Sequence, residues 1–140
     1  MKSLRQILVI EDEQDITIIV KMILEEYGGY VVRTCPDGQS GIEAVKNFQP
    51  DLILLDVMMP GFDGIQTIQA LRNAQSTCEA PVIFMTAKIQ EKEIEAYRKL
   101  GAIDVIAKPF DPFQLNQTIQ QIWDNYQRTI DIPYESSIFN

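Results

Sequence analysis

Two short aliphatic runs in the sequence end in carboxylates. Leu52–Leu55 leads directly into Asp56, and Ile7–Ile10 leads into Glu11 and Asp12. Four consecutive large aliphatic residues are typical of a strand buried on both faces, and the residue after such a run lies at the strand's carboxyl-terminal end. Taken singly, Asp56 is explained as well by a turn as by a reaction, because aspartate often bonds the backbone of a following turn. The case for chemistry therefore depends on what else reaches the same place.

A hydroxyl and an ammonium follow two further apolar segments, since Thr86 ends one and Lys108 follows another. In a parallel sheet these strand ends lie along one edge, where ligands of such sheets bind. Three carboxylates there repel each other, so either their pKa values rise or a cation is present. Oxygen ligands without histidine or cysteine favour Mg²⁺ first, with Ca²⁺ or Mn²⁺ behind it. A metal, a hydroxyl and an ammonium around one carboxylate suit a phosphoryl group carried as aspartyl phosphate.

The elements that must position these residues follow from the apolar pattern. The spacing of apolar residues and the positions of turn residues predict five strands, near residues 5–10, 30–34, 52–56, 82–86 and 103–107. They alternate with five helices, near residues 14–27, 38–49, 64–72, 90–100 and 112–126, and Tyr27 belongs to the inward stripe of the first helix. The fourth helix has a weak apolar stripe, which predicts shallow packing. Alternating strands and helices predict an α/β fold with a parallel sheet and right-handed crossovers.

Composition excludes several classes of function. A formal net charge of −8 and a pI of about 4.4 argue against nonspecific binding to nucleic acid or anionic membranes. No apolar run approaches the ~18 residues of a membrane span, so a cytoplasmic protein is expected. The absence of histidine excludes a Ser-His or Cys-His nucleophile and a histidyl phosphocarrier role. Cys35 and Cys78 are predicted to be free thiols, because they fall near opposite edges of the sheet.

Four blocks of the chain together resemble a known family. They are Ile7–Glu13, Leu52–Gly61, Val82–Ala87 and Lys108–Phe110, and their order and spacing match the receiver domain of bacterial two-component response regulators. The resemblance spans about residues 4–126. It implies a five-stranded parallel sheet of order 2-1-3-4-5 flanked by five helices, a flavodoxin-like, doubly wound fold of the CheY type.

The resemblance also implies a role for each residue at the strand ends. Asp56 becomes the phosphoacceptor. Mg²⁺ would be bound directly by Asp12 and Asp56, through water by Glu11, and by the backbone carbonyl of Met58. Thr86 would bond the phosphoryl oxygen and reposition on activation, and Lys108 would pair with the phosphoryl group. The Lys108–Pro109 peptide bond is expected to be cis.

The function implied is signalling within a phosphorelay. The chain would accept a phosphoryl group from a sensor histidine kinase or a histidine phosphotransfer protein, and would then switch the surface of its fourth helix, fifth strand and fifth helix toward an effector protein. Homodimerisation is left open. No enzymatic activity is expected beyond the chain's own phosphorylation and dephosphorylation.

Several positions depart from the family's usual pattern. Glu11 stands where Asp is commoner, which lengthens the reach to the ion. Val105 occupies the place where many members carry a switching Tyr or Phe, so rotation of an aromatic ring there cannot be this chain's signal. Met58 and Lys88, each two residues beyond a site residue, flank the phosphoryl position and should affect water access and thus phosphoryl lifetime.

Two rival functions fit parts of the pattern. A phosphohydrolase with an Asp nucleophile usually has a second acid two residues later, where this chain has Met58. A degenerate receiver that signals without phosphorylation is disfavoured by the intact set of Asp12, Asp56, Thr86 and Lys108. Residues 1–127 are predicted to form the receiver domain, and residues 128–140 a flexible tail without an attached output domain.

Overall fold

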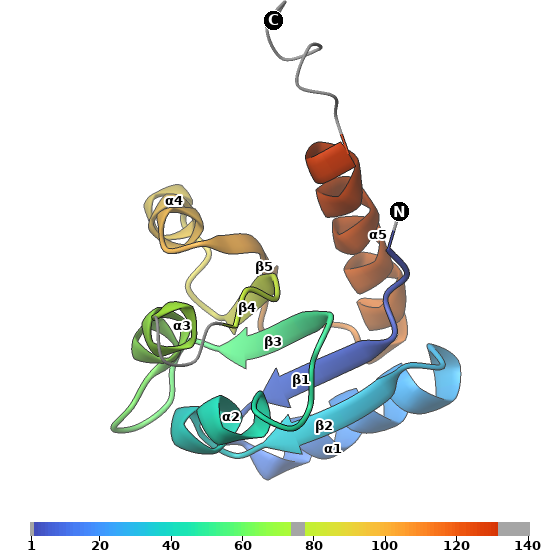
Figure 1. Cartoon of the computed structure of the whole chain (residues 1–140), viewed down its shortest axis with the longest axis horizontal. Coiled ribbons are helices and arrows are strands. Elements are labelled where there is room, and N and C mark those ends of the chain that lie inside the picture. Colours follow the sequence, from blue (N-terminus) through green and yellow to red (C-terminus); the bar gives the residue numbers. More distant parts are fainter. Residues whose placement is uncertain (1, 74–77, 132–140) are drawn as a thin grey trace, which may run out of the picture.

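The strands form one parallel sheet. The structure, a computed structural model, describes residues 2–73 and 78–131 (Figure 1). The strands are β1 (Gln6–Ile10), β2 (Val31–Cys35), β3 (Leu52–Asp56), β4 (Val82–Thr86) and β5 (Ala102–Ala107). They pair in the order β2-β1-β3-β4-β5, which confirms the predicted topology. The ends of the strands at Ile10, Cys35, Asp56, Thr86 and Ala107 form the carboxyl edge of the sheet, and their beginnings form the amino edge.

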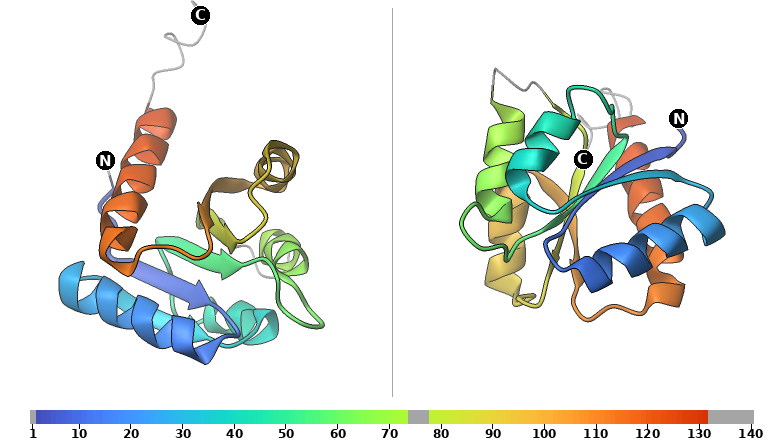
Figure 2. Two further views of the ribbon diagram at one scale, coloured as in Figure 1. Left: turned by 180° about the vertical axis from the view of Figure 1, so that it is seen from behind. Right: turned by 90° about the horizontal axis from the view of Figure 1, so that it is seen from below.

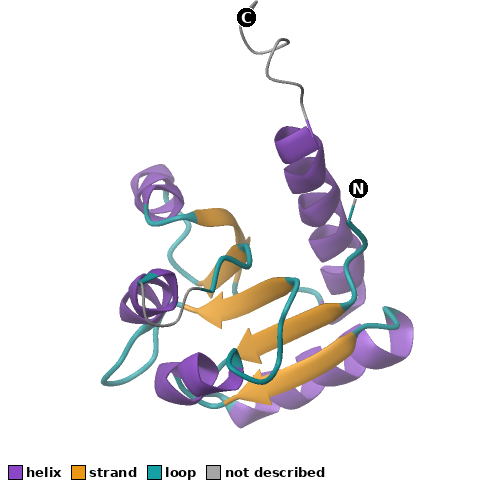
Figure 3. Cartoon of the chain, viewed as in Figure 1, coloured by secondary structure: helices purple, strands orange, loops and turns teal. Residues whose placement is uncertain are grey.

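The helices cover both faces of this sheet (Figures 2 and 3). One face carries α1 (Gln14–Met22), its continuation η1 (Ile23–Tyr27) and α5 (Pro112–Asp131). The other carries α2 (Gly38–Ala44), α3 (Gly64–Arg72) and α4 (Glu91–Lys99). Every side chain of β3 and β4 is buried, as expected for central strands packed on both faces. No helix in the described part of the chain is both long and apolar enough to cross a membrane.

The turn after β3 sets the position of Asp56. Gly61 has a φ of +76°, which favours glycine, and the chain then enters α3 through a capping box between Asp63 and Gln66. Helix α3 begins at Gly64, close behind the end of the strand. A side chain does not fit at this position, because a Cβ would lie 2.4 Å from the carbonyl oxygen of Asp56. The beginning of α3 is thus packed against the backbone of Asp56.

The first helix differs from its prediction at Tyr27, which is 70% exposed rather than inward. Residues 23–27 form a π-helical segment, in which the N–H of Gly28 donates to the carbonyl of Ile23 (3.2 Å). A π-helix has more residues per turn than an α-helix, so each residue advances by a smaller angle and the apolar stripe loses its period. Tyr27 consequently faces away from the core.

Two helix ends also differ from the predictions. Helix α2 ends at Ala44 rather than near Pro50, although Phe48 still packs against the core. Helix α5 continues to Asp131, four residues into the segment predicted as a tail. The chain before β1 lies beside this end of α5 (Figure 1), where Lys2 donates to Gln127 and accepts from Trp123. Residues 132–140 of the predicted tail lie outside the described residues.

Candidate functional site

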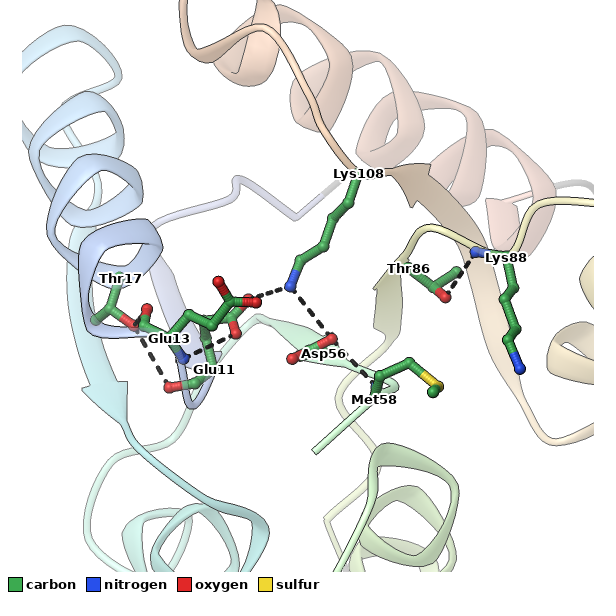
Figure 4. Close-up of polar contacts among 8 residues, drawn as sticks. All are labelled: Glu11, Glu13, Thr17, Asp56, Met58, Thr86, Lys88 and Lys108. Carbon is green, nitrogen blue, oxygen red and sulfur yellow. Dashed lines mark hydrogen bonds and ion pairs between the residues drawn. The ribbon is translucent and has the colours of Figure 1, made fainter. Parts of the chain in front are cut away.

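Asp56 ends β3 in a crowded, buried position. The residue is 2% exposed, and its neighbours in the sheet are β1 and β4, with Asp56 opposite Met85. Its Oδ1 accepts a hydrogen bond from the backbone N–H of Met58 (3.2 Å), which is the turn-type bond expected of a strand-end aspartate (Figure 4). The hydrogen bond to the turn thus orients the Asp56 carboxylate at the carboxyl edge of the sheet.

Lys108 bridges two of the three predicted acidic residues. Its Nζ lies 2.7 Å from Oε1 of Glu11 and 3.3 Å from Oδ1 of Asp56, and its side chain is 14% exposed. The backbone of Lys108 is fixed by its N–H, which donates to the carbonyl of Thr86 (2.9 Å). The Lys108–Pro109 bond is cis, as the resemblance implied. An ammonium group is thus held directly beside the Asp56 carboxylate.

Glu11 is more tightly engaged than its sequence position suggests. One oxygen pairs with Lys108, and the other accepts the backbone N–H of Glu13 (3.1 Å). The N–H of Glu11 itself donates to the carbonyl of Cys35, which ties the end of β1 to β2 (3.0 Å). One oxygen of Glu11 is thus held by an ion pair and the other by a backbone hydrogen bond.

The three carboxylates form a group that could hold a metal ion. One oxygen from each of Glu11, Asp12 and Asp56 lies within 4.8 Å of the others. Asp12 is exposed, whereas Glu11 and Asp56 are buried. Carboxylate oxygens without nitrogen or sulfur ligands suit a hard divalent cation such as Mg²⁺, and an exposed member leaves room for the waters that Mg²⁺ retains. The residues present therefore fit the predicted ion.

The charges in the site shift two pKa values. Burial, and then the hydrogen bond and charge of Glu11, raise the pKa of Asp56 to about 7, although the charge of Lys108 opposes this. Burial lowers the pKa of Lys108, but the Glu11 and Asp56 carboxylates outweigh it, so the pKa is raised above its ordinary value. Lys108 therefore offsets only part of the repulsion between the carboxylates that the sequence predicts at this edge.

Thr86 lies at the same edge as Asp56 and bonds the loop beyond β4. The residue is fully buried, and its Oγ1 accepts the backbone N–H of Lys88 (3.0 Å) (Figure 4). Among the described residues no hydrogen bond joins Thr86 to Asp56. Met58 flanks the carboxylate with a side chain that is 58% exposed, and Val105 is half-buried on β5.

An apolar surface beside the site was not predicted from the sequence. A cavity of about 150 Å³ lies between α1 and the loop before α5, and its lining is Ile16, Ile19, Lys108, Pro109, Phe110 and Pro112. The same two helices also carry exposed apolar side chains, namely Ile18 and Met22 on α1 and Phe113 on α5. We call these three and Ile19 the α1–α5 patch. Ile16 and Ile19 have the spacing of a core-facing helical stripe, so their sequence pattern does not indicate a surface cavity.

Comparison with known sequences identifies the family. The model of the response regulator receiver domain matches residues 7–120. The chain is 37% identical to the alkaline phosphatase synthesis transcriptional regulatory protein PhoP of Bacillus subtilis, over 84% of this chain and 48% of that protein. It is 39% identical to the phosphate regulon transcriptional regulatory protein PhoB of Escherichia coli, over 84% of this chain and 51% of that protein. The chain thus spans about half the length of these relatives.

Solved structures agree with the sequence comparison. The chemotaxis response regulator CheY4 of Vibrio cholerae is 26% identical with a TM-score of 0.77, over 86% of this chain and 99% of that one. A Francisella response regulator receiver domain is 26% identical with a TM-score of 0.76, over 87% and 98%. The fold and the family model coincide over the residues that carry the acidic cluster and Lys108. This chain belongs to the family of response regulator receiver domains.

Proposed function

We propose that Asp56 accepts a phosphoryl group from the phosphohistidine of a sensor histidine kinase or a histidine phosphotransfer protein. The observation that carries this proposal is the contact of a buried carboxylate with an ammonium group, 3.3 Å apart, in a cluster of acidic oxygens. In the transfer the phosphorus–nitrogen bond of the donor breaks as a bond to a carboxylate oxygen of Asp56 forms. The imidazole of the donor is the leaving group.

Each neighbouring residue has a part in this transfer. The Met58 N–H fixes the orientation of the Asp56 carboxylate, since it donates to Oδ1. Lys108 is placed to move its ammonium from Glu11 toward the phosphoryl oxygens, where negative charge spreads during transfer. Glu11 would keep the ammonium in place when no phosphoryl group is bound. The site is thereby pre-organised for an anion that arrives from outside.

Mg²⁺ is the cofactor that the acidic group suits best, with Mn²⁺ or Ca²⁺ as substitutes. Asp12 and Asp56 would hold it directly, Glu11 through water, and the Met58 carbonyl would complete the protein ligands. When bound, the ion would offset the repulsion between the carboxylates and the phosphoryl oxygens. Asp12 is the exposed member of the group, so its side chain is accessible to solvent.

The α1–α5 patch supports a protein as the phosphoryl donor. Met22 is 44% exposed and Phe113 is 79% exposed, and Ile19 of the patch lines the same cavity as Lys108 of the site. Exposed apolar side chains next to a reactive group are typical of a protein-binding surface. A donor protein seated there would bring its phosphohistidine to the carboxyl edge.

Two alternatives receive less support. A phosphohydrolase would need a general acid near Asp56, whereas the side chain two residues later is that of Met58 and points its thioether outward (Figure 4). A receiver that signals without phosphorylation would not require Lys108 to face Asp56 at 3.3 Å. We therefore favour a signalling phosphoacceptor that acts on an effector through the surface of α4, β5 and α5.

Incorporation of phosphoryl groups from acetyl phosphate with Mg²⁺ tests the proposal. We expect the wild-type chain to be labelled and Asp56→Asn to lose labelling at least about 100-fold while it remains folded. Asp63→Asn is a matched control, because Asp63 lies near the same edge and asparagine caps a helix as well as aspartate does. Undiminished labelling of Asp56→Asn would contradict the proposal.

A further inference from the structure

Helix α4 is anchored to the sheet by one side chain. Among its nine residues, all of which the structure describes, only Tyr97 is buried, with 4% of its surface exposed. Ile94 is half-buried, and most other side chains of the helix are charged and exposed. A helix with so little buried apolar surface is held weakly, so the position of α4 depends mainly on Tyr97.

Tyr97 packs on the strand that leads to the candidate site. Its ring meets that of Phe84 edge to face, with centroids 5.2 Å apart and an interplanar angle of 65°. Such aromatic pairs contribute more than the burial of their area alone. Phe84 lies in the middle of β4 and is fully buried, and its partner on β5 is the small residue Val105. The aromatic group at this place in the core therefore comes from α4 and not from β5.

Two routes connect this contact to Thr86. Phe84 and Thr86 are two residues apart on β4, so their side chains face the same side of the sheet. Thr86 also accepts the N–H of Lys88, in the loop that leads into α4 (3.0 Å). If the Thr86 side chain rotates to bring its hydroxyl to a new acceptor, Oγ1 moves away from the Lys88 N–H that it now accepts. The loop that enters α4 then loses its hydrogen bond to the end of β4.

We propose that the contact between Tyr97 and Phe84 transmits the state of Thr86 to α4. Tyr97 is a positioning residue, and it acts through Phe84 rather than on the phosphoryl group. When Thr86 releases Lys88, the ring of Tyr97 shifts on Phe84 and the charged outer face of α4 moves with it. This inference rests on the proposed phosphoacceptor function of Asp56.

Fluorine NMR of the chain labelled with 3-fluorotyrosine tests the inference. Beryllofluoride with Mg²⁺ serves as the phosphoryl mimic, and the same spectrum reports the bound mimic and the tyrosines. We expect the Tyr97 resonance, assigned with Tyr97→Phe, to move by more than its linewidth when the mimic binds. Tyr27, which is 70% exposed beside the far strand β2, is the internal control and should stay unchanged.

The two possible failures are distinguishable in this spectrum. A bound mimic with an unchanged Tyr97 resonance would overturn the inference and leave the proposed function standing. Absence of any bound mimic would contradict the phosphoacceptor function and the inference with it.

A second measurement separates transmission from a merely structural role. In the wild type, amide exchange in α4 should differ by about tenfold between the free and the beryllofluoride-bound chain. In Tyr97→Leu this difference should fall to about twofold or less, and Tyr97→Phe should restore it, because phenylalanine keeps the ring contact. If Tyr97→Leu speeds exchange equally in both states and preserves their difference, Tyr97 is only an anchor and the inference is wrong.

Discussion

Two aspartates at opposite ends of β3 have opposite electrostatic environments. Asp51 precedes the strand at the amino edge, and Asp56 ends it at the carboxyl edge. Asp51 accepts the N–H groups of Arg5 and Gln6 (3.0 and 2.9 Å) and pairs with Lys2 (3.1 Å). Burial raises its pKa, but these partners outweigh burial and the pKa lies below its ordinary value. Asp56 has one backbone donor and a neighbouring carboxylate, and its pKa is raised to about 7.

The difference lies in how completely the charge is satisfied. Asp51 has a donor for each oxygen and no acidic neighbour that raises its pKa, so its charge stabilises the fold by joining the chain before β1 to β3. Asp56 shares its ammonium with Glu11, so its charge is costly until a cation or a phosphoryl group changes the balance. Asp56 thus differs from Asp51 by the incomplete pairing of its charge, which fits the phosphoacceptor role proposed for it.

The largest expected effect is a gain of stability in Asp56→Asn. The folded-state pKa of about 7 exceeds the ordinary value of 3.8, so the folded chain binds more protons and its stability falls as the pH rises between these values. Asparagine does not titrate, so in EDTA the variant should gain about 2 kcal/mol over the wild type at pH 8 and much less at pH 5. Urea unfolding at both pH values measures this. If the free energy of unfolding depended on pH in the same way in the wild type and in Asp56→Asn, the contrast between Asp51 and Asp56 would be wrong.

Asp51→Ala should have the opposite effect. It removes the acceptor of two backbone N–H groups and the partner of Lys2, so the free energy of unfolding should fall by about 1–2 kcal/mol at pH 7. Phosphoryl incorporation per folded molecule should stay unchanged, because Asp51 lies at the other edge. Urea unfolding and acetyl phosphate labelling check the two parts. A loss of labelling with intact folding would show that the edges are not separate in function.

Mg²⁺ should relieve the repulsion at the carboxyl edge. At a concentration of about ten times its dissociation constant, Mg²⁺ should stabilise the wild type by about 1.4 kcal/mol at pH 8. The gain should be smaller at pH 5, where protons compete for Asp56, and Asp12→Asn should lose most of it. Thermal unfolding with and without Mg²⁺ provides the measurement. Equal stabilisation of Asp12→Asn would place the ion elsewhere.

The smallest effect is expected from the α1–α5 patch. With a histidine kinase that phosphorylates the wild type, Phe113→Ala should slow transfer about fivefold, a loss near 1 kcal/mol of contact energy. Transfer from acetyl phosphate should not change. Ile130→Ala is the matched control, because Ile130 is 56% exposed on the part of α5 near the amino edge. Equal slowing by both variants would remove the patch from donor binding.

The sequence is sufficient for the strands and for the residues at their ends. Buried aliphatic runs predict β3 and β4 closely, and the parallel topology brings Asp12, Asp56, Thr86 and Lys108 to one edge. The partners that each residue has within the site could not be predicted. Lys108 pairs with Glu11 as well as with Asp56, and Thr86 accepts the N–H of Lys88. These choices depend on distances of a few tenths of an ångström, which residue spacing does not contain.

Other differences arise where tertiary contacts override local pattern. The π-helical segment turns Tyr27 outward although its spacing from Val20 is helical. Helix α5 extends past residue 127 beside Lys2, a contact between the two ends of the chain that no local signal indicates. Asp51 gave no sequence signal beyond its place before a strand. Its role depends on Arg5 and Gln6, 46 and 45 residues away.

Location of the phosphoryl group tests the central claim most directly. The wild-type chain, phosphorylated by acetyl phosphate with Mg²⁺, is reduced with borohydride, which converts aspartyl phosphate to homoserine, and the modified residue is located by mass spectrometry. The account predicts homoserine at position 56 and an unchanged Asp51. Modification at Asp51 or Asp12 instead, with Asp56 intact, would contradict it.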